Sequence, residues 1–156
     1  MSRWTLEFLD QVKGIAEAAG HVILNIYQQD DIEIQTKLDH SPLTQADLAA
    51  HEIITKALHA LTPDIPILSE EGETLTGEVD TFWCVDPLDG TKEFIARNGE
   101  FTVNIALVIE GKSVLGVIYA PVLNTLYYAA EGIGAFKQLA NQDAETINVR
   151  QLQERG

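Results

Sequence analysis

Hydrophobic residues recur every three or four positions along the first part of the chain, which is the spacing of one buried face of an α-helix. The pattern predicts an amphipathic helix that ends near Tyr27, with apolar positions at Leu6, Leu9, Val12, Ala16, Ala19, Ile23 and Ile26. A second helix is predicted between Thr44 and Pro63, because Asp47 follows Thr44 as in a capping box and the proline ends the pattern. We expect the first helix to serve as scaffold.

Apolar runs in the remainder of the chain predict strands. Residues 32–37 alternate between apolar and polar, which is typical of a half-exposed strand, and lead into a polar turn over 39–42. Two short continuous runs, 65–68 and 82–85, indicate buried strands. Later runs with short connections predict an antiparallel meander. These later runs are 101–109, 113–120 and 125–130.

Both short buried strands are followed by acidic residues. Asp86 and Asp89 follow the 82–85 run, and we expect that strand to stop at Val85 because Pro87 cannot donate to a sheet ladder. Glu70 follows the 65–68 run. Two strands that end in this way would bring Glu70, Asp86 and Asp89 together at one edge of a sheet.

The residues after these acids are suited to binding an anion. Gly90 allows a tight turn, and Thr91 can begin a helix whose first N–H groups have no partner within the helix. Such free donors form an anion-binding site that suits phosphate. Carboxylates beside a phosphate seat are chemically consistent if divalent cations lie between them. The motif therefore predicts a metal-dependent phosphatase.

Composition and charge narrow the range of partners. With 156 residues, 46% of them hydrophobic, the chain is most simply one domain with a buried core. Its 24 acidic and 10 basic residues give a net charge of −14, which argues against unaided binding to a nucleic-acid polymer or an anionic membrane. A small phosphorylated substrate stays compatible, since bound cations reverse the local field. No segment has the apolar length of a signal peptide or a membrane span.

The single cysteine and the histidines suggest no further site. Cys84 lies in an apolar run and has no partner for an internal disulfide, so we expect it in the core of a cytoplasmic protein. His51 begins a sequence similar to the helical zinc-protease motif, but Thr55 stands where the second histidine is required, and the motif fails.

Each candidate residue also has an ordinary structural explanation. An Asp-Pro-Leu-Asp-Gly turn forms without metal in many proteins. Asp47 is a carboxylate of the kind that the helix dipole favours near a helix start, and Thr91 could be a simple N-cap. The neighbouring Glu71 and Glu93 fit solvated surface charges. On the residues alone, these explanations remain open beside the metal site.

Two segments together resemble the inositol monophosphatase superfamily. Its pattern is a Glu-Glu pair followed by Asp-Pro-(Ile/Leu)-Asp-Gly-(Thr/Ser), which matches 68–71 and 83–91. The continuation over 92–107 is similar to the 3'(2'),5'-bisphosphate nucleotidase branch. The resemblance implies an α+β fold in which two amino-terminal helices pack on a largely antiparallel sheet. It further implies a phosphatase amino-terminal domain over 1–137 and a polar tail over 138–156 that leads to a second domain absent from this chain.

The resemblance also implies roles for individual residues. Two or three Mg²⁺ ions are expected. Glu70, Asp86 and the Leu88 carbonyl would hold one, Asp86 and Asp89 a second, and Glu70 would approach a third through water. The scissile phosphate would be received by Glu70 and by the backbone of Leu88, Asp89, Gly90 and Thr91. Glu70, Asp47 and Thr91 would be catalytic, the last two orienting and deprotonating the attacking water.

The implied reaction is hydrolysis of 3'-phosphoadenosine 5'-phosphate to AMP and phosphate, within sulfur metabolism and inhibited by lithium. Inositol monophosphate is the alternative substrate. Family members carry a later Trp-Asp-x-Ala motif that completes the second metal site, so we expect this chain to have weak activity or none. We also expect self-association through the face that a second domain would cover. Some relatives are peripheral on the inner membrane, which adds that location to the cytoplasmic expectation.

Other classes of function predict different outcomes. Haloacid-dehalogenase phosphatases use the first aspartate of Asp-x-Asp-Gly-Thr as nucleophile, but here the two acids are one residue too far apart, and a phospho-aspartate at Asp86 would be required. A non-catalytic fragment would bind Mg²⁺ or nucleotide without turnover. If the chain were a purely structural module, Asp86→Asn and Asp89→Asn would change neither binding nor turnover.

Overall fold

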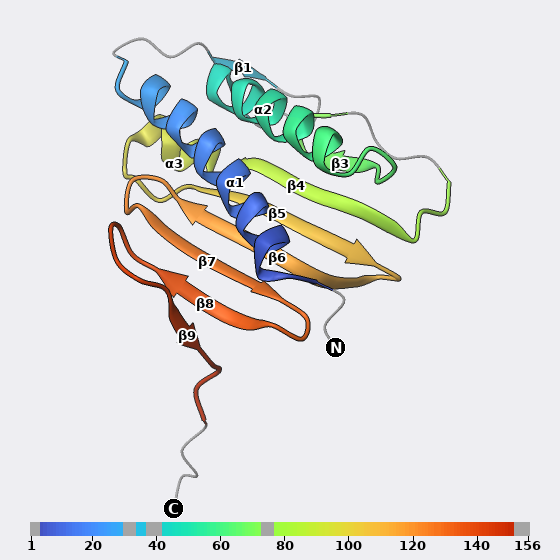
Figure 1. Cartoon of the computed structure of the whole chain (residues 1–156). Helices are drawn as coiled ribbons and strands as arrows, with labels where there is room; N and C mark the ends of the chain where they lie inside the picture. The colour runs from blue at the N-terminus through green and yellow to red at the C-terminus, as the bar shows by residue number, and fades with distance from the viewer. Residues whose placement is uncertain (1–3, 30–33, 37–41, 73–76, 152–156) are drawn as a thin grey trace, which may run out of the picture.

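Two long helices lie on one face of a seven-stranded sheet in the computed structural model, which describes residues 4–29, 34–36, 42–72 and 77–151 (Figure 1). The helices are α1 (Leu6–Tyr27) and α2 (Gln45–Leu61). The strands follow the order β3-β4-β5-β6-β7-β8-β9 across the sheet. The predicted α+β fold, with two amino-terminal helices on a largely antiparallel sheet, is confirmed.

Local sequence explains both helices. Thr5 caps α1 by accepting a hydrogen bond from the Phe8 N–H. Most of the apolar positions predicted for this helix are buried, whereas Leu6, in its first turn, is 56% exposed. Thr44 and Asp47 form the predicted capping box of α2. Gly20 permits close packing, since a Cβ there would lie 2.2 Å from Cε1 of Tyr119. Helix α1 can therefore lie directly against the sheet.

The sheet is mixed at one edge and antiparallel elsewhere. Strand β3 (Ile67–Ser69) is parallel to β4 (Thr81–Asp89), and β4 is antiparallel to β5 (Thr102–Ile109). The predicted meander continues through β6 (Lys112–Ala120) and β7 (Thr125–Ala130). The short helix α3 (Thr91–Ala96) connects β4 to β5, beginning where the sequence predicted.

Further strand pairing lies at both ends of the chain. Strand β1 (Ile34–Thr36) confirms part of the strand expected over 32–37 and pairs with β2 (Pro42–Thr44), so Pro42 belongs to a strand; the rest of the expected turn lies outside the described residues. Strands β8 (Gly134–Gln138) and β9 (Glu145–Ile147) extend the sheet beyond β7. The segment expected as a polar tail thus supplies an edge strand, because main-chain pairing requires no apolar pattern.

Strand β4 does not stop at Val85 as expected. It continues to Asp89, with an irregular register between the pairs Asp86–Asn104 and Asp89–Thr102. Two residues of β4, Pro87 and Leu88, there face a single residue of β5, which is the count of a β-bulge. Proline is tolerated at a bulge because the ladder does not need its missing N–H. The bulge therefore carries the strand through the proline.

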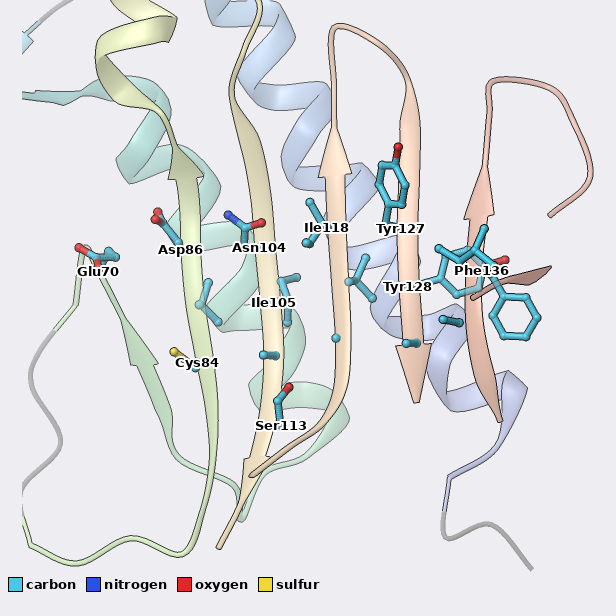
Figure 2. A pocket seen from close by; sticks show the side chains of 17 residues that line it. Glu70, Cys84, Asp86, Asn104, Ile105, Ser113, Ile118, Tyr127, Tyr128 and Phe136 are labelled. Carbon is cyan, nitrogen blue, oxygen red and sulfur yellow. The ribbon is translucent and has the colours of Figure 1, made fainter. Parts of the chain in front are cut away.

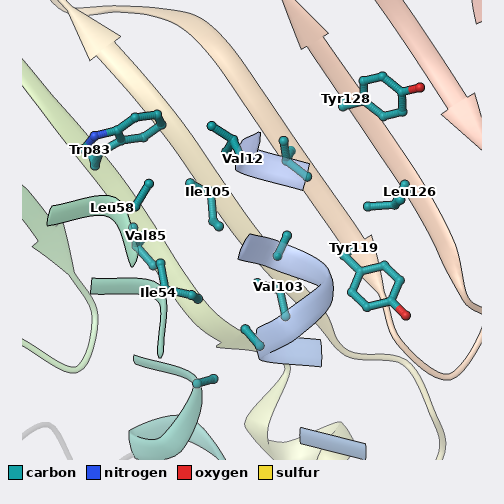
Figure 3. Close-up of a cluster of buried hydrophobic side chains, with 14 of the residues drawn as sticks. Val12, Ile54, Leu58, Trp83, Val85, Val103, Ile105, Tyr119, Leu126 and Tyr128 are labelled. Carbon is teal, nitrogen blue, oxygen red and sulfur yellow. The ribbon is translucent and has the colours of Figure 1, made fainter. Parts of the chain in front are cut away.

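Alternation along the strands separates two faces of the sheet. Trp83, Val85, Val103 and Ile105 point toward the helices and are buried with residues of α1 and α2 (Figure 3). Cys84 lies between two of these positions, so its side chain points to the opposite face and is exposed. The expectation that Cys84 is in the core is therefore wrong. None of the helices in the described ranges is long and apolar enough to cross a bilayer.

Candidate active site

The carboxyl ends of β3 and β4 bring Glu70 beside Asp86. The two strands are parallel, with Ser69 in register with Val85, and the Glu70 N–H donates to the Val85 carbonyl oxygen at 3.1 Å. The next residues along, Glu70 and Asp86, consequently project at the same edge of the sheet (Figure 2). The proximity of these two acids, expected from the runs that precede them, is present in the structure.

Asn104 connects the bulged end of β4 to β5. It faces Asp86 across the strand pair, and its Nδ2 donates to Asp89 Oδ2 at 3.4 Å and to Thr102 Oγ1 at 3.1 Å. Asn104 was not among the site residues predicted from the sequence. The available signal was its polar side chain at a position where the alternation of the 101–109 run turns outward. Asn104 therefore lies opposite one aspartate of the motif and is hydrogen-bonded to the other.

The three acids expected to meet at this edge, Glu70, Asp86 and Asp89, do not form one cluster. Over the part of the chain that the structure describes, no group of three or more His, Cys, Asp or Glu side chains is close enough to hold one metal ion. Glu70 approaches Asp86 from the β3 side, whereas Asp89 is linked to Asn104 on the β5 side. Their carboxylate oxygens match the chemistry that Mg²⁺ prefers.

Asp47 and Thr91 are hydrogen-bonded, which is the pairing that the family resemblance implied. The buried Asp47 receives the Thr91 hydroxyl on Oδ1 at 2.9 Å. Its Oδ2 receives the Thr44 N–H at 3.0 Å and the Thr44 hydroxyl at 2.6 Å. A buried carboxylate needs such donors, because an unpaired one is costly. The capping box and the link to Thr91 thus coexist, each using one oxygen of the same carboxylate.

Gly90 makes the turn that places Thr91. Its φ of 97° is in the left-handed region, and a Cβ there would lie 2.9 Å from the carbonyl oxygen of Glu100. Only glycine adopts this conformation without strain and without that contact. The Thr91 hydroxyl lies 3.4 Å from the Leu88 carbonyl oxygen, so the two ends of the turn are in contact.

A second side chain of α2 reaches the same edge. His51 follows Asp47 by one helical turn, and its Nδ1 lies 2.7 Å from Oγ of Ser69, the residue before Glu70. Burial lowers the pKa of His51 from 6.5, and the nearby charge of Glu52 opposes that change. This contact of His51 was not predicted, because Ser69 is distant from it in the chain and the local sequence suggested only a zinc motif.

The face of the sheet away from the helices is hollowed and largely apolar. A cavity of about 480 Å³ extends from the acidic edge across β5 to β8 (Figure 2). Its floor includes Ile118 and Tyr127, and Glu70, Asp86 and Asn104 lie at its polar end. This volume is within the range of small-molecule sites in proteins. In the described part of the chain, the acidic edge is thus continuous with an open apolar face.

Comparisons with known proteins agree with this geometry. A model of the inositol monophosphatase family matches residues 5–154. The 3'(2'),5'-bisphosphate nucleotidase CysQ of Salmonella typhimurium is 53% identical over 147 residues, which are 87% of this chain and 59% of that protein. The chain therefore spans well under two thirds of the length of this relative.

Solved structures show the same likeness. The crystal structure of CysQ from Bacteroides thetaiotaomicron superposes with a TM-score of 0.77 at 39% identity, over 97% of this chain and 61% of that chain. A structure described as an IMPase/NADP phosphatase complexed with Mg²⁺ and phosphate has a TM-score of 0.68 at 25% identity, over 77% of this chain and 46% of that one.

Proposed function

The chain belongs to the inositol monophosphatase family, and on this premise we propose that it forms the amino-terminal part of a Mg²⁺-dependent phosphomonoesterase. The observation that carries the proposal is the hydrogen bond from Thr91 to the buried Asp47, beside the edge where Glu70 meets Asp86. This arrangement places a hydroxyl with a fixed acceptor next to carboxylates that can hold cations.

Metal binding is assigned to the carboxylates of this edge. Proteins of this family are generally metal-dependent, and one structural relative is described with Mg²⁺ and phosphate. We assign Glu70, Asp86 and the Leu88 carbonyl to one ion and Asp86 with Asp89 to a second, with Glu70 near a third. When bound, Mg²⁺ acidifies the attacking water and balances the charge of the phosphate.

The protein's own groups orient the water and the phosphate. The Thr91 hydroxyl gives its only proton to Asp47, so its lone pairs are available to accept a hydrogen bond from water at the edge. As the water loses a proton to Thr91 Oγ, the proton of Thr91 can move to Asp47 Oδ1. Backbone N–H groups of the Gly90 turn bind the phosphate, and Glu70 helps to hold both the water and the phosphate.

The proposed substrate is 3'-phosphoadenosine 5'-phosphate, hydrolysed to AMP and phosphate. Support comes from the naming of the relative at 53% identity as a bisphosphate nucleotidase. Inositol monophosphate is the second candidate, because a structural relative at 28% identity is described with that ligand bound. The chain covers 59% of the length of this nucleotidase relative.

Self-association and location complete the proposal. The open apolar face contains Ile118 and Tyr127, which are 45% and 39% exposed, and pairing of two such faces would remove them from water. Sedimentation at several concentrations tests this, and a monomer at every concentration contradicts it. The single cysteine supports a reducing, cytoplasmic compartment.

Phosphate release with and without Mg²⁺ is the direct test of the proposed function. The panel contains the bisphosphate nucleotide, inositol monophosphate and fructose bisphosphate, each with a lithium control. Thr91→Val should abolish any release, whereas Thr125→Val, in a buried strand position remote from the edge, should not. Calorimetry with Mg²⁺ and nucleotide separates a binding fragment from a catalyst. A chain that neither binds Mg²⁺ nor releases phosphate refutes the proposal.

A further inference from the structure

Helix α2 touches two separate turns of the candidate site at positions one helical turn apart. Asp47 holds Thr91, and His51 contacts Ser69. We propose that His51 is a positioning residue, which holds Glu70 in place for metal binding through the hydroxyl of Ser69. The inference rests on the proposed function in assigning Glu70 to a metal ion.

Ser69 joins the end of β3 to the turn that carries Glu70. It is 6% exposed, its Oγ accepts a hydrogen bond from the Glu71 N–H at 3.4 Å, and its carbonyl accepts the Gly72 N–H at 3.1 Å. On the other side, the Glu70 N–H is bonded to Val85. In the described part of the chain, the turn is attached to β4 by its backbone and contacts α2 through Ser69 and His51.

The hydrogen-bond chemistry indicates the direction of this contact. Since the Glu71 N–H donates to Ser69 Oγ, the hydroxyl proton of Ser69 is free to point to His51 Nδ1, 2.7 Å away. A neutral imidazole with its proton on Nε2 accepts at Nδ1. Burial of His51 favours this neutral form by lowering its pKa. Ser69 thus links the imidazole to the backbone of the turn.

Packing supplies independent support for a fitted contact. A Cβ at Gly72 would lie 3.1 Å from Cε1 of His51, which is tighter than an ordinary carbon contact. The turn therefore approaches the imidazole ring closely as well as bonding to it. His59, two further turns along the same helix, is exposed. The two histidines of α2 differ in their contact with the turn.

The consequence is that one rigid helix sets the relative position of two site elements that the chain brings from different places. Glu70 is held through His51, and Thr91 is held through Asp47. Removing a group that orients a metal ligand without itself binding the metal typically weakens metal affinity by about 10- to 100-fold. We expect the effect of removing His51 at the lower end, about tenfold, because the backbone bond from Glu70 to Val85 remains.

The test measures Mg²⁺ affinity by calorimetry and exchange of the Glu71 amide by NMR in the metal-free protein. His51→Ala should weaken Mg²⁺ binding about tenfold and speed the exchange. His51→Asn, whose Oδ1 can accept near the position of Nδ1, should restore both. His59→Ala is the matched control and should change neither. Ser69→Ala should match His51→Ala, and the double variant should lose no more than either alone.

Any one of three results would overturn the positioning role. They are unchanged Mg²⁺ affinity and amide exchange in His51→Ala, failure of His51→Asn to restore them, and additive losses in the double variant. If the unaltered protein binds no Mg²⁺, the proposed function fails by itself, and the exchange measurement still decides whether His51 holds the turn. If His51→Ala does not fold, Ser69→Ala and His51→Asn carry the comparison.

Discussion

The buried carboxylate of Asp47 supports a prediction in which stability and function separate. One oxygen caps α2 through Thr44, and the other accepts the hydroxyl of Thr91. Asp47→Ala removes both contacts, whereas Thr91→Val removes only the second. We therefore expect a large loss of stability from the first substitution and a small one from the second, with phosphate release or nucleotide binding impaired in both.

The magnitude follows from the groups left without partners. Losing the cap costs about 1 kcal/mol. Thr44 is 1% exposed, and leaving its hydroxyl proton without an acceptor adds about 1–3 kcal/mol. The total for Asp47→Ala is thus about 3 kcal/mol, or about 6–12 °C in Tm for a chain of this size. Thr91→Val removes the donor to Oδ1 of the buried Asp47, and because Oδ2 keeps both bonds from Thr44 we expect a cost at the low end of that range, about 1 kcal/mol.

Urea unfolding followed by the fluorescence of the buried Trp83 measures these differences. Asp10→Ala is the control, because this exposed residue makes a surface ion pair with Lys13 and should cost less than about 0.5 kcal/mol. Two results would refute the assignment of one Asp47 oxygen to helix capping and the other to Thr91. They are equal losses in Asp47→Ala and Thr91→Val, or a loss below about 1 kcal/mol in Asp47→Ala.

Three further predictions test other parts of the structure. Gly20→Ala should destabilise the protein by about 1–3 kcal/mol in urea unfolding, because the new Cβ would lie 2.2 Å from the Tyr119 ring; an unchanged midpoint contradicts this packing. Cys84 should react with a maleimide in the folded protein at a rate near that of the unfolded chain, and slow labelling would indicate that its face is covered. The lowered pKa of His51 means that the unfolded chain binds its proton more readily, so its contribution to stability is complete above pH 6.5 and declines as pH falls toward the folded-state pKa. The difference in unfolding free energy between the unaltered protein and His51→Asn should shrink over that range, and an NMR titration of His51 at 6.5 or above would contradict it.

Local rules in the sequence accounted for the helices, the meander and one pair of site residues. The end of α1 at Tyr27 and the capping box of α2 depend on side chains within a few positions of each other, which is why periodicity and capping residues predicted them. Glu70 and Asp86 could be placed together because each follows a short buried strand. The pairing of Thr91 with Asp47 came from family resemblance, since nothing in the local sequence links residues so far apart.

Tertiary structure decided the remainder, because it depends on which strands are neighbours and where their register changes. The bulge at Pro87 carried β4 onward to Asp89, which is bonded to Asn104, and in the described part of the chain the three acids form no single cluster. Strand β9 exists through main-chain pairing that its polar side chains do not reveal. His51 reaches Ser69 only because α2 packs beside the end of β3. The sequence by itself thus determined which chemical groups are available, and packing determined which of them meet.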